Sequence, residues 1–152
     1  MIPYGRQHIT DQDIAAIEDV LRSDWLTQGP TIGLFEGLVA ENCGTSFAVA
    51  VNSATSALHI ACLALGLGPG DWLWTSPNTF VASANCARYC GASVDFVDID
   101  PKTYNMSLAA LADKLHQAAK EKRLPKVVIP VHFAGQSCDM KAIAELGRKY
   151  NF

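Results

Sequence analysis

From residue 46 onward, short apolar segments of β-type character alternate with longer segments of helical periodicity. Glycine and proline residues separate most of these segments and mark short connections between elements. The expected strands are residues 46–51, 72–75, 94–97 and 126–131, and the expected helices are residues 56–65, 76–89, 108–122 and 139–150. Strands that alternate with helices form a mostly parallel sheet covered on both faces. The sequence therefore predicts an α/β fold with three layers, α/β/α.

Two further helices are expected before this alternation begins. Thr10 and Asp13 have the spacing of a capping box, and apolar residues at helical intervals follow them, which predicts a helix over residues 11–22. A second helix is expected over residues 31–44, where a glycine ends it. The chain is thus expected to consist of an N-terminal helical arm, residues 1–45, and an α/β part, residues 46–152.

The segment between the expected strand 46–51 and the expected helix 56–65 favours an anion site. Ser53, Thr55 and Ser56 follow the strand directly and open the helix. Free N–H groups and the positive end of the helix dipole meet at such a point, so a phosphate fits there with the hydroxyls as further donors. The alternative is that these residues only cap the helix.

Other candidate side chains follow the later strands, at the sheet edge where ligands collect in parallel sheets. Phe80, one turn into the expected helix 76–89, is placed either to stack on a flat cofactor ring or to join the core. His132 is either a polar contact in a cleft or a locally hydrogen-bonded residue. Asp98 and Asp100 lie beside a proline and either act on a substrate or build a turn.

The composition narrows the classes of partner. A net charge of −3, with 18% charged and 49% hydrophobic residues, is typical of a soluble globular protein and carries no basic footprint for nucleic acid or for an anionic membrane. We find neither a signal peptide nor an apolar run of membrane-spanning length, so a cytoplasmic protein is expected. Five cysteines without a complete ligand set indicate reduced thiols and no metal site.

Five stretches in a fixed order resemble the nucleotide-sugar aminotransferases, which are enzymes that use pyridoxal phosphate (PLP) and have the aspartate-aminotransferase fold. The stretches are SDWLTQGP (23–30), NSATSAL (52–58), SPNTFVASAN (76–85), VDIDP (97–101) and VHFAGQ (131–136). Together they cover nearly the whole chain. Residues 2–7 and 26–30 most resemble the branch that aminates a 4-keto sugar on the route to pseudaminic acid.

The resemblance implies a role for each matching residue. Ala54 and Thr55 would hold the PLP phosphate, and Phe80 would stack on its pyridine ring. The residues that would contact the nucleotide-sugar substrate, partly across a dimer interface, are Tyr4, Leu26, Thr27, Gln28, Gly29 and Ser56.

The resemblance also implies the reaction and its setting. The full-length enzyme would be a cytoplasmic homodimer of cell-surface polysaccharide biosynthesis. It would transfer an amino group from glutamate to a nucleotide-linked 4-keto-6-deoxy sugar such as UDP-4-keto-6-deoxy-N-acetyl-altrosamine. The fold implied for residues 46–152 is the first, incomplete part of the large domain of a type I PLP transferase.

The lysine that binds PLP covalently in this family has no counterpart here. None of the seven lysines lies in a stretch that matches the lysine motif of the family. The chain is therefore expected to be the N-terminal part of such an enzyme and inactive by itself. Strand 46–51 would lack its neighbours in the sheet, so we expect an isolated chain of this length to be unstable, to rearrange or to associate.

Two other functions stay open at this point. A non-catalytic α/β module that binds phosphate or a partner would keep the phosphate turn without the lysine. An unrelated nucleotide-binding domain is disfavoured, because the chain has neither a P-loop nor a G-x-G-x-x-G turn after a strand. A G-x-S-x-G elbow is also missing, which disfavours a serine hydrolase.

Overall fold

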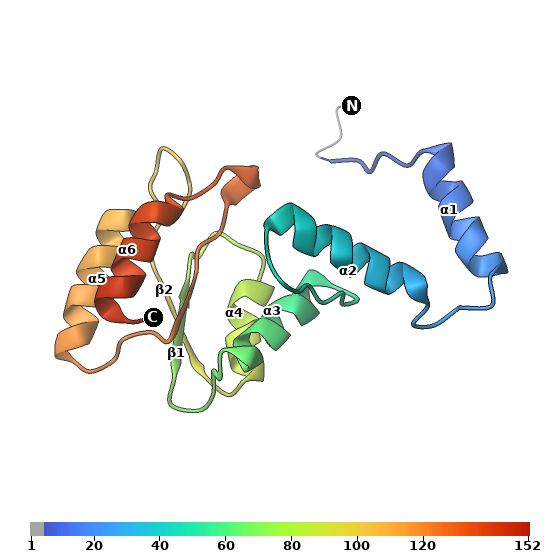
Figure 1. Cartoon of the computed structure of the whole chain (residues 1–152). Coiled ribbons are helices and arrows are strands. Elements are labelled where there is room, and N and C mark those ends of the chain that lie inside the picture. Colours follow the sequence, from blue (N-terminus) through green and yellow to red (C-terminus); the bar gives the residue numbers. More distant parts are fainter. Residues whose placement is uncertain (1–4) are drawn as a thin grey trace. The chain divides into compact units, whose positions relative to one another are not determined.

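The computed structural model describes residues 5–152 (Figure 1). The chain divides into two compact units, of which the first ends at Ala50 and the second is Val51–Phe152. The first unit contains α1 (Asp11–Arg22) and α2 (Pro30–Cys43). The second contains α3 (Ala54–Ala64), β1 (Trp72–Thr75), α4 (Ala82–Tyr89), β2 (Ser93–Phe96), α5 (Leu108–Lys120), β3 (Val127–Ile129), a 3-10 turn (Phe133–Gly135) and α6 (Met140–Tyr150).

Both helices of the first unit begin and end where local signals place them. Thr10 and Asp13 form the expected capping box: the Thr10 N–H donates to Asp13 Oδ2 at 2.7 Å, and the Asp13 N–H donates to Thr10 Oγ1 at 3.3 Å. Pro30 occupies the first turn of α2, and Gly44 ends it in the left-handed conformation with φ +63°. The two helices expected from the sequence are confirmed within one residue.

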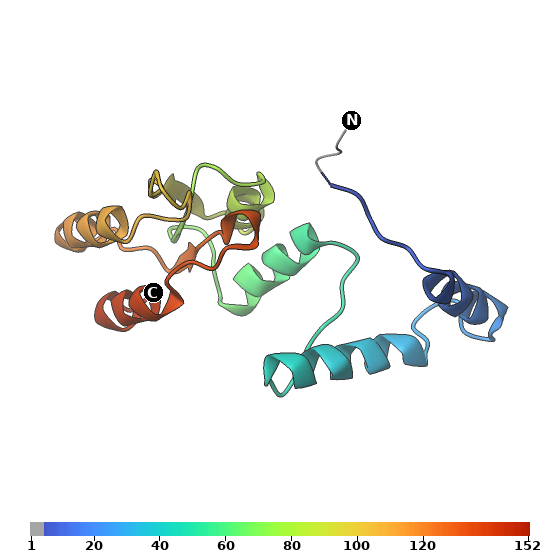
Figure 2. The same cartoon turned by 90° about the horizontal axis from the view of Figure 1, so that it is seen from above.

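The second unit is built on a parallel sheet with the strand order β2-β1-β3. Trp72 pairs with Ser93 on one side of β1, and Leu73 pairs with Val127 on the other. Helices α3 and α4 pack together on one face of the sheet, and α5 and α6 lie side by side on the other (Figures 1 and 2). The three-layer α/β/α architecture with a parallel sheet is confirmed.

The alternation of side chains along β1 produces one core on each face. Leu73 is fully buried with Cys62 and Cys86 on the side of α3 and α4. Trp74 is 2% exposed and packs with Leu111 and Leu115 of α5 on the other side. Neighbouring residues of a strand point to opposite faces, so this four-residue strand anchors both layers of helices.

In the described part of the chain, the cysteines form no disulfide and no helix is suited to span a membrane. All five cysteines are free thiols; Cys62, Cys86 and Cys138 are buried, and Cys43 is exposed. Within residues 5–152, each helix is too short or too polar to cross a bilayer.

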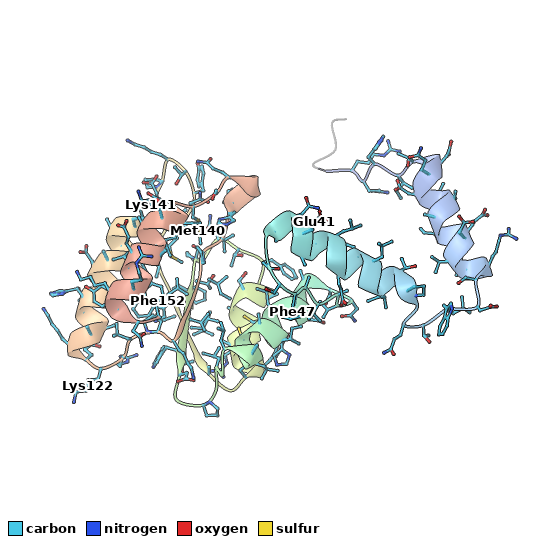
Figure 3. All side chains as sticks on the ribbon, viewed as in Figure 1. Glu41, Phe47, Lys122, Met140, Lys141 and Phe152 are labelled. Atoms are coloured by element: carbon cyan, nitrogen blue, oxygen red, sulfur yellow. The ribbon has the colours of Figure 1, made fainter. Side chains whose placement is uncertain are left out.

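The strand expected over residues 46–51 is not formed. These residues are extended, but no segment among residues 5–152 pairs with them, and Phe47 and Val49 are 87% and 71% exposed. Figure 3 labels Phe47 on this extended segment. Among the described residues, this segment makes one hydrogen bond to a helix: the N–H of Ala50 donates to Glu36 Oε1 of α2 at 2.8 Å. Apolar β-type residues make a strand only when a second strand supplies the ladder, and none does so here.

The helix expected over residues 76–89 begins six residues late, at Ala82. Residues 76–81 form turns instead, because Pro77 disfavours helical geometry at Ser76 and because the side chain of Asn78 donates to the carbonyl of Tyr104 at 3.0 Å. Phe80 therefore lies in a loop and not one turn into a helix. The remaining elements of the second unit agree with the expected ranges within about three residues at each end.

We predict that the two units of the 152-residue chain differ sharply in amide protection. Helices α1 and α2 contain no buried residue, whereas β1 is covered on both faces. Amides of Leu73 and Trp74 should therefore exchange more slowly than those of α1 by about two orders of magnitude or more, because openings of weakly packed segments cost far less than global unfolding. Hydrogen exchange followed by NMR measures this difference.

Equal protection of α1 and β1 in a monomeric sample would contradict the prediction.

The same sample tests the expectation that the chain is unstable or associates. We expect a broad thermal transition by circular dichroism or oligomers by analytical ultracentrifugation, and a sharp two-state melt of a monomer would refute that expectation.

Candidate functional site

Helix α3 begins directly after a serine that caps it. Ser53 has extended dihedral angles, φ −161° and ψ 155°, and its Oγ accepts a hydrogen bond from the N–H of Ser56 at 3.2 Å. The N–H of Ala57 bonds to the carbonyl of Ser53 and closes the first turn. The N–H groups of Ala54 and Thr55 precede the helical ladder, so they are the donors that this helix end offers to a ligand.

The hydrogen bonds of this turn show which residue caps the helix. Capping is the role of Ser53, whose Oγ also lies 3.0 Å from Ser56 Oγ. Ser56 Oγ in turn donates to Asn52 Oδ1 at 2.8 Å, which orients its hydroxyl. Among residues 5–152, no hydrogen bond occupies the N–H groups of Ala54 and Thr55, and the positive end of the α3 dipole would favour an anion such as phosphate beside them. The turn from Ser53 to Ser56 is called the phosphate turn below.

A second feature is a cavity of about 590 Å³ where β1 and β3 end. The two strands are parallel neighbours, so the loops that follow them leave the same edge of the sheet. We call this cavity the ring pocket; its lining residues are Pro77, Asn78, Thr79, Phe80, Val131, His132, Phe133 and Ala134. Phe80 is 74% exposed, so the alternative that it belongs to the core is wrong.

Two polar atoms near the ring pocket are buried without a partner. Ser76 Oγ and Asn78 Oδ1 have no hydrogen-bond partner among the described residues. Both follow β1, at the edge of the sheet where the ring pocket opens. Buried polar atoms that lack a partner in a native fold indicate a place for a water or for a polar group of a ligand.

The imidazole of His132 is oriented by the backbone. Its Nδ1 accepts a hydrogen bond from the N–H of Cys138 at 3.1 Å, and Cys138 is itself buried. In the neutral ring the proton therefore lies on Nε2, which makes that atom a hydrogen-bond donor at the ring pocket. The local hydrogen bond and the place in a cleft, which the sequence left as alternatives, occur together.

Asp98 and Asp100 build turns in the structure. Asp98 accepts the N–H of Ile99 at 2.8 Å. Asp100 Oδ1 accepts the N–H groups of Lys102 at 2.8 Å and Thr103 at 3.1 Å, and these bonds hold the pKa of its carboxyl below the ordinary value. The two carboxylates therefore order the chain between β2 and α5.

Two asparagines beside the ring pocket were not singled out from the sequence. Asn78 belongs to the stretch 76–85, but its contact with Tyr104 lies 26 positions away. Asn105 is 5% exposed and holds residues 28 to 32 positions away. No local pattern reveals such bonds, although an asparagine next to a proline-containing turn is a weak signal.

The loop between α1 and α2 carries the other candidate residues. Leu26, Gln28 and Gly29 line a cavity of about 450 Å³ within the first unit, and Thr27 is exposed on the same loop. A Cβ on Gly29 would lie 2.8 Å from Trp25 Cβ, so only glycine permits this close approach. Gln28 has φ +49°, a left-handed conformation that tightens the turn.

The candidate residues therefore do not form one site within the described structure but lie in separate places. Phe80 and His132 share the ring pocket, and Ala54, Thr55 and Ser56 lie at the start of α3, outside its lining. Leu26, Thr27, Gln28 and Gly29 belong to the first unit. Tyr4 lies outside the described residues.

Comparison with known proteins identifies the chain by its sequence. It matches the model of the DegT/DnrJ/EryC1/StrS aminotransferase family over residues 7–152. The spore coat polysaccharide biosynthesis protein SpsC of Bacillus subtilis is 42% identical over 149 residues, which cover 98% of this chain and 37% of that protein. The UDP-4-amino-4-deoxy-L-arabinose–oxoglutarate aminotransferase of Shewanella sediminis is 38% identical, with the same coverage of both chains.

Solved structures are similar as well. A sugar aminotransferase from Streptococcus pneumoniae in its PLP form has a TM-score of 0.84 at 32% identity, with coverage of 97% of this chain and 36% of that one. Helicobacter pylori PseC, an aminotransferase involved in the biosynthesis of pseudaminic acid, has a TM-score of 0.84 at 29% identity, with coverage of 99% and 39%. The chain spans about 37% of the length of the curated relatives it matches.

We predict that the turn held by Asp100 loosens in acid. The pKa of Asp100 lies lower in the folded chain than in the unfolded one, about 3.9, so its contribution to stability is complete above that value and is lost as the pH falls through the lowered pKa. The amides of Lys102 and Thr103 should then exchange faster than the intrinsic acid dependence requires. An NMR titration with D100A as the reference measures the effect, and an identical profile in both proteins would contradict it.

Proposed function

The chain belongs to the DegT/DnrJ/EryC1/StrS aminotransferase family, and we propose from this membership that it binds pyridoxal phosphate and forms part of an enzyme that aminates a nucleotide-linked keto sugar. The observation that carries the proposal is the phosphate turn, in which Ser53 caps α3 and leaves the N–H groups of Ala54 and Thr55 for an anion. The N–H donors of this turn suit a phosphate and the exposed ring of Phe80 suits stacking on a planar ring, which supports the proposal.

The phosphate turn is the proposed handle for the cofactor. Ala54 and Thr55 would donate their N–H groups to the phosphate, and the hydroxyl of Thr55 would donate a further hydrogen bond. Hydrogen bonds to a charged acceptor are stronger than those between neutral groups, and the α3 dipole adds to them. Ser53 would act indirectly, because its bond to Ser56 holds the first turn of the helix in place.

The ring pocket is the proposed site for the pyridine ring. Phe80 is exposed at 74% and presents a flat aromatic face, which suits stacking on a planar ring. His132 would donate from Nε2 to an acceptor on the ligand, since Cys138 holds its Nδ1. Ser76 Oγ and Asn78 Oδ1 supply partners for water or for polar ligand groups at the same edge. When bound, PLP supplies an electron sink: its conjugated ring would take up negative charge from the carbon that carries the amino group.

The substrate assignment extends the resemblance of residues 2–7 and 26–30. We propose that Tyr4, Leu26, Thr27, Gln28, Gly29 and Ser56 contact a nucleotide-linked 4-keto-6-deoxy sugar such as UDP-4-keto-6-deoxy-N-acetyl-altrosamine. The similarity to Helicobacter pylori PseC, an aminotransferase involved in the biosynthesis of pseudaminic acid, supports this branch. The name of the Shewanella relative includes oxoglutarate, the keto acid that glutamate becomes when it gives up its amino group, and this supports glutamate as the donor.

The setting of the reaction is part of the same proposal. The enzyme would be a cytoplasmic homodimer that acts in the biosynthesis of cell-surface polysaccharide, a role in line with the name of SpsC, a spore coat polysaccharide biosynthesis protein. Residues 1–45 would form the helical arm, and residues 46–152 would form the first part of the PLP-binding domain.

A second candidate is a non-catalytic module that binds phosphate or a partner. It is favoured by one observation: the phosphate turn, in which Ser53 caps α3 and leaves the N–H groups of Ala54 and Thr55 for an anion, needs no further residue to bind a phosphate. Such a module would keep the phosphate turn and the ring pocket for binding alone. The two candidates share the binding residues and differ in the transfer of the amino group.

Binding is tested with pyridoxine 5′-phosphate, which lacks the aldehyde and therefore does not react with surface lysines. We expect T55V, which removes one hydroxyl donor, to weaken binding about tenfold, as the loss of a hydrogen bond to a charged group predicts. F80A should weaken the binding of pyridoxine 5′-phosphate by about tenfold or less, which corresponds to the loss of one aromatic contact. Isothermal titration calorimetry measures both.

Inorganic phosphate provides the matched control. T55V should weaken the binding of both ligands. F80A should weaken the binding of pyridoxine 5′-phosphate and leave the binding of inorganic phosphate unchanged, since Phe80 is assigned to the ring alone. Binding of both ligands at wild-type affinity by T55V would refute the role of the phosphate turn. The 152-residue chain is expected to be inactive by itself, so the two candidates are separated with the longer protein of which it would be a part: with PLP and glutamate, formation of oxoglutarate would favour the enzyme, and binding without it would favour the module.

A further inference from the structure

The connection between β2 and α5 touches both loops that line the ring pocket. The first loop, residues 76–81, follows β1, and the second loop, residues 132–137, follows β3. Residues 100–106 lie between β2 and α5 in the sequence and form the turn that we call the bridging turn. Its side chains and carbonyls make hydrogen bonds to each loop.

Asn105 holds the second loop. Its Oδ1 accepts the N–H of Phe133 at 2.9 Å, and its Nδ2 donates to the carbonyls of Gln136 at 3.1 Å and Ser137 at 3.2 Å. These bonds determine which end of the amide carries the nitrogen, because Phe133 offers a donor and the other two offer acceptors. Asn105 is 5% exposed, so these bonds are shielded from water. Three bonds from one side chain fix the second loop against the bridging turn.

Asn78 attaches the first loop to the same turn. Its Nδ2 donates to the carbonyl of Tyr104 at 3.0 Å. The ring of Tyr104 also lies against that of Phe133, with the ring centres 5.8 Å apart. Tyr104 therefore contacts the first loop through its backbone and the second loop through its side chain.

The bridging turn is itself held in a costly conformation. Tyr104 has φ +59°, in the left-handed region that few residues other than glycine adopt. Such a conformation persists only when the surrounding bonds over-determine it. Here the N–H of Tyr104 bonds to the carbonyl of Asp100 at 2.8 Å, and the N–H of Asp100 bonds to the carbonyl of Asn105 at 2.8 Å. Met106, the next residue, is 4% exposed in the core.

We propose that the bridging turn couples the two loops of the ring pocket, and that Asn105 is the residue that positions the second loop in that pocket. The occupant of the pocket rests on the proposed function, whereas the coupling does not. Asn105 is a positioning residue: it acts through the backbone of Phe133, Gln136 and Ser137, which follow His132.

The test measures each loop while the opposite loop is altered. N78A removes the bond from the first loop to Tyr104 and leaves the bonds of Asn105 in place. N105A removes three bonds of the second loop and leaves Asn78 in place. N42A is the control, because among the described residues Asn42 Nδ2 donates only within its own helix, to the carbonyl of Leu38 in α2. The readout is amide exchange by NMR in the 152-residue chain.

Coupling predicts effects on amides that the altered side chain does not touch. N78A should accelerate exchange at Phe133 by about threefold or more, and N105A should accelerate it at Ser83 and Asn85, which bond to the carbonyls of Phe80 and Val81, by a similar factor, as the loss of about one hydrogen bond implies. If N105A fails to fold, N78A decides alone, since Asn78 is only half-buried and loses a single bond.

Exchange at Phe133 that is the same in N78A and N42A would overturn the proposal. Titration with pyridoxine 5′-phosphate separates it from the proposed function. Weaker binding by N105A, whose side chain does not line the ring pocket, with unchanged binding by N42A, supports positioning of the ring pocket. If wild-type protein shows coupled exchange but binds no pyridoxine 5′-phosphate, the proposed function fails and the coupling stands.

Discussion

The second unit depends on the pairing of β1 with a neighbour on each side. Leu73, Trp74 and Thr75 of this strand are 2% exposed or less, because strands cover its edges and helices cover both its faces. Thr75 adds a side-chain bond, from its Oγ1 to the carbonyl of Ile129 at the end of β3, at 3.0 Å. The carbonyl of Thr75 also accepts the N–H of Val97 after β2. All three strands therefore end at one level, and the loops that follow β1 and β3 can line a single cavity.

The first unit lacks such a constraint. Its helices have a capping box, a proline in the first turn of α2 and a left-handed glycine at the end of α2, yet none of their residues is buried. Caps and side-chain periodicity determine where a helix begins and ends, whereas burial comes from a partner surface. Ile14, Ile17 and Phe35 are more than half exposed, which shows an apolar face formed by the local sequence and not covered by it.

The same distinction explains which parts of the fold could be predicted. Ser107 and Asp139 cap α5 and α6 through bonds to residues three positions on, so these helices follow from nearby residues. The paired strands were also found, because strands buried on both faces read as short apolar runs. Residues 46–51 have the same composition, but a strand requires a ladder partner, and composition does not supply one. The first loop was mistaken for a helix because the bond from Asn78 to Tyr104 spans 26 positions.

The candidate site also has one part that follows from neighbouring residues and one part that depends on residues far apart in the sequence. The phosphate turn uses the N–H groups of consecutive residues at a helix end, so a run of small hydroxyl residues after a β-type segment is enough to suggest it. The ring pocket needs two loops that are about 50 positions apart in the sequence and that meet only because β1 and β3 are parallel neighbours. Asn105 holds one of these loops, and the left-handed φ of Tyr104 turns a carbonyl toward the other. The left-handed conformation of Tyr104 persists because a relaxed backbone at this residue would lose the contacts of Tyr104 with both loops. The geometry of the pocket is therefore stabilised by a turn that lines no part of it.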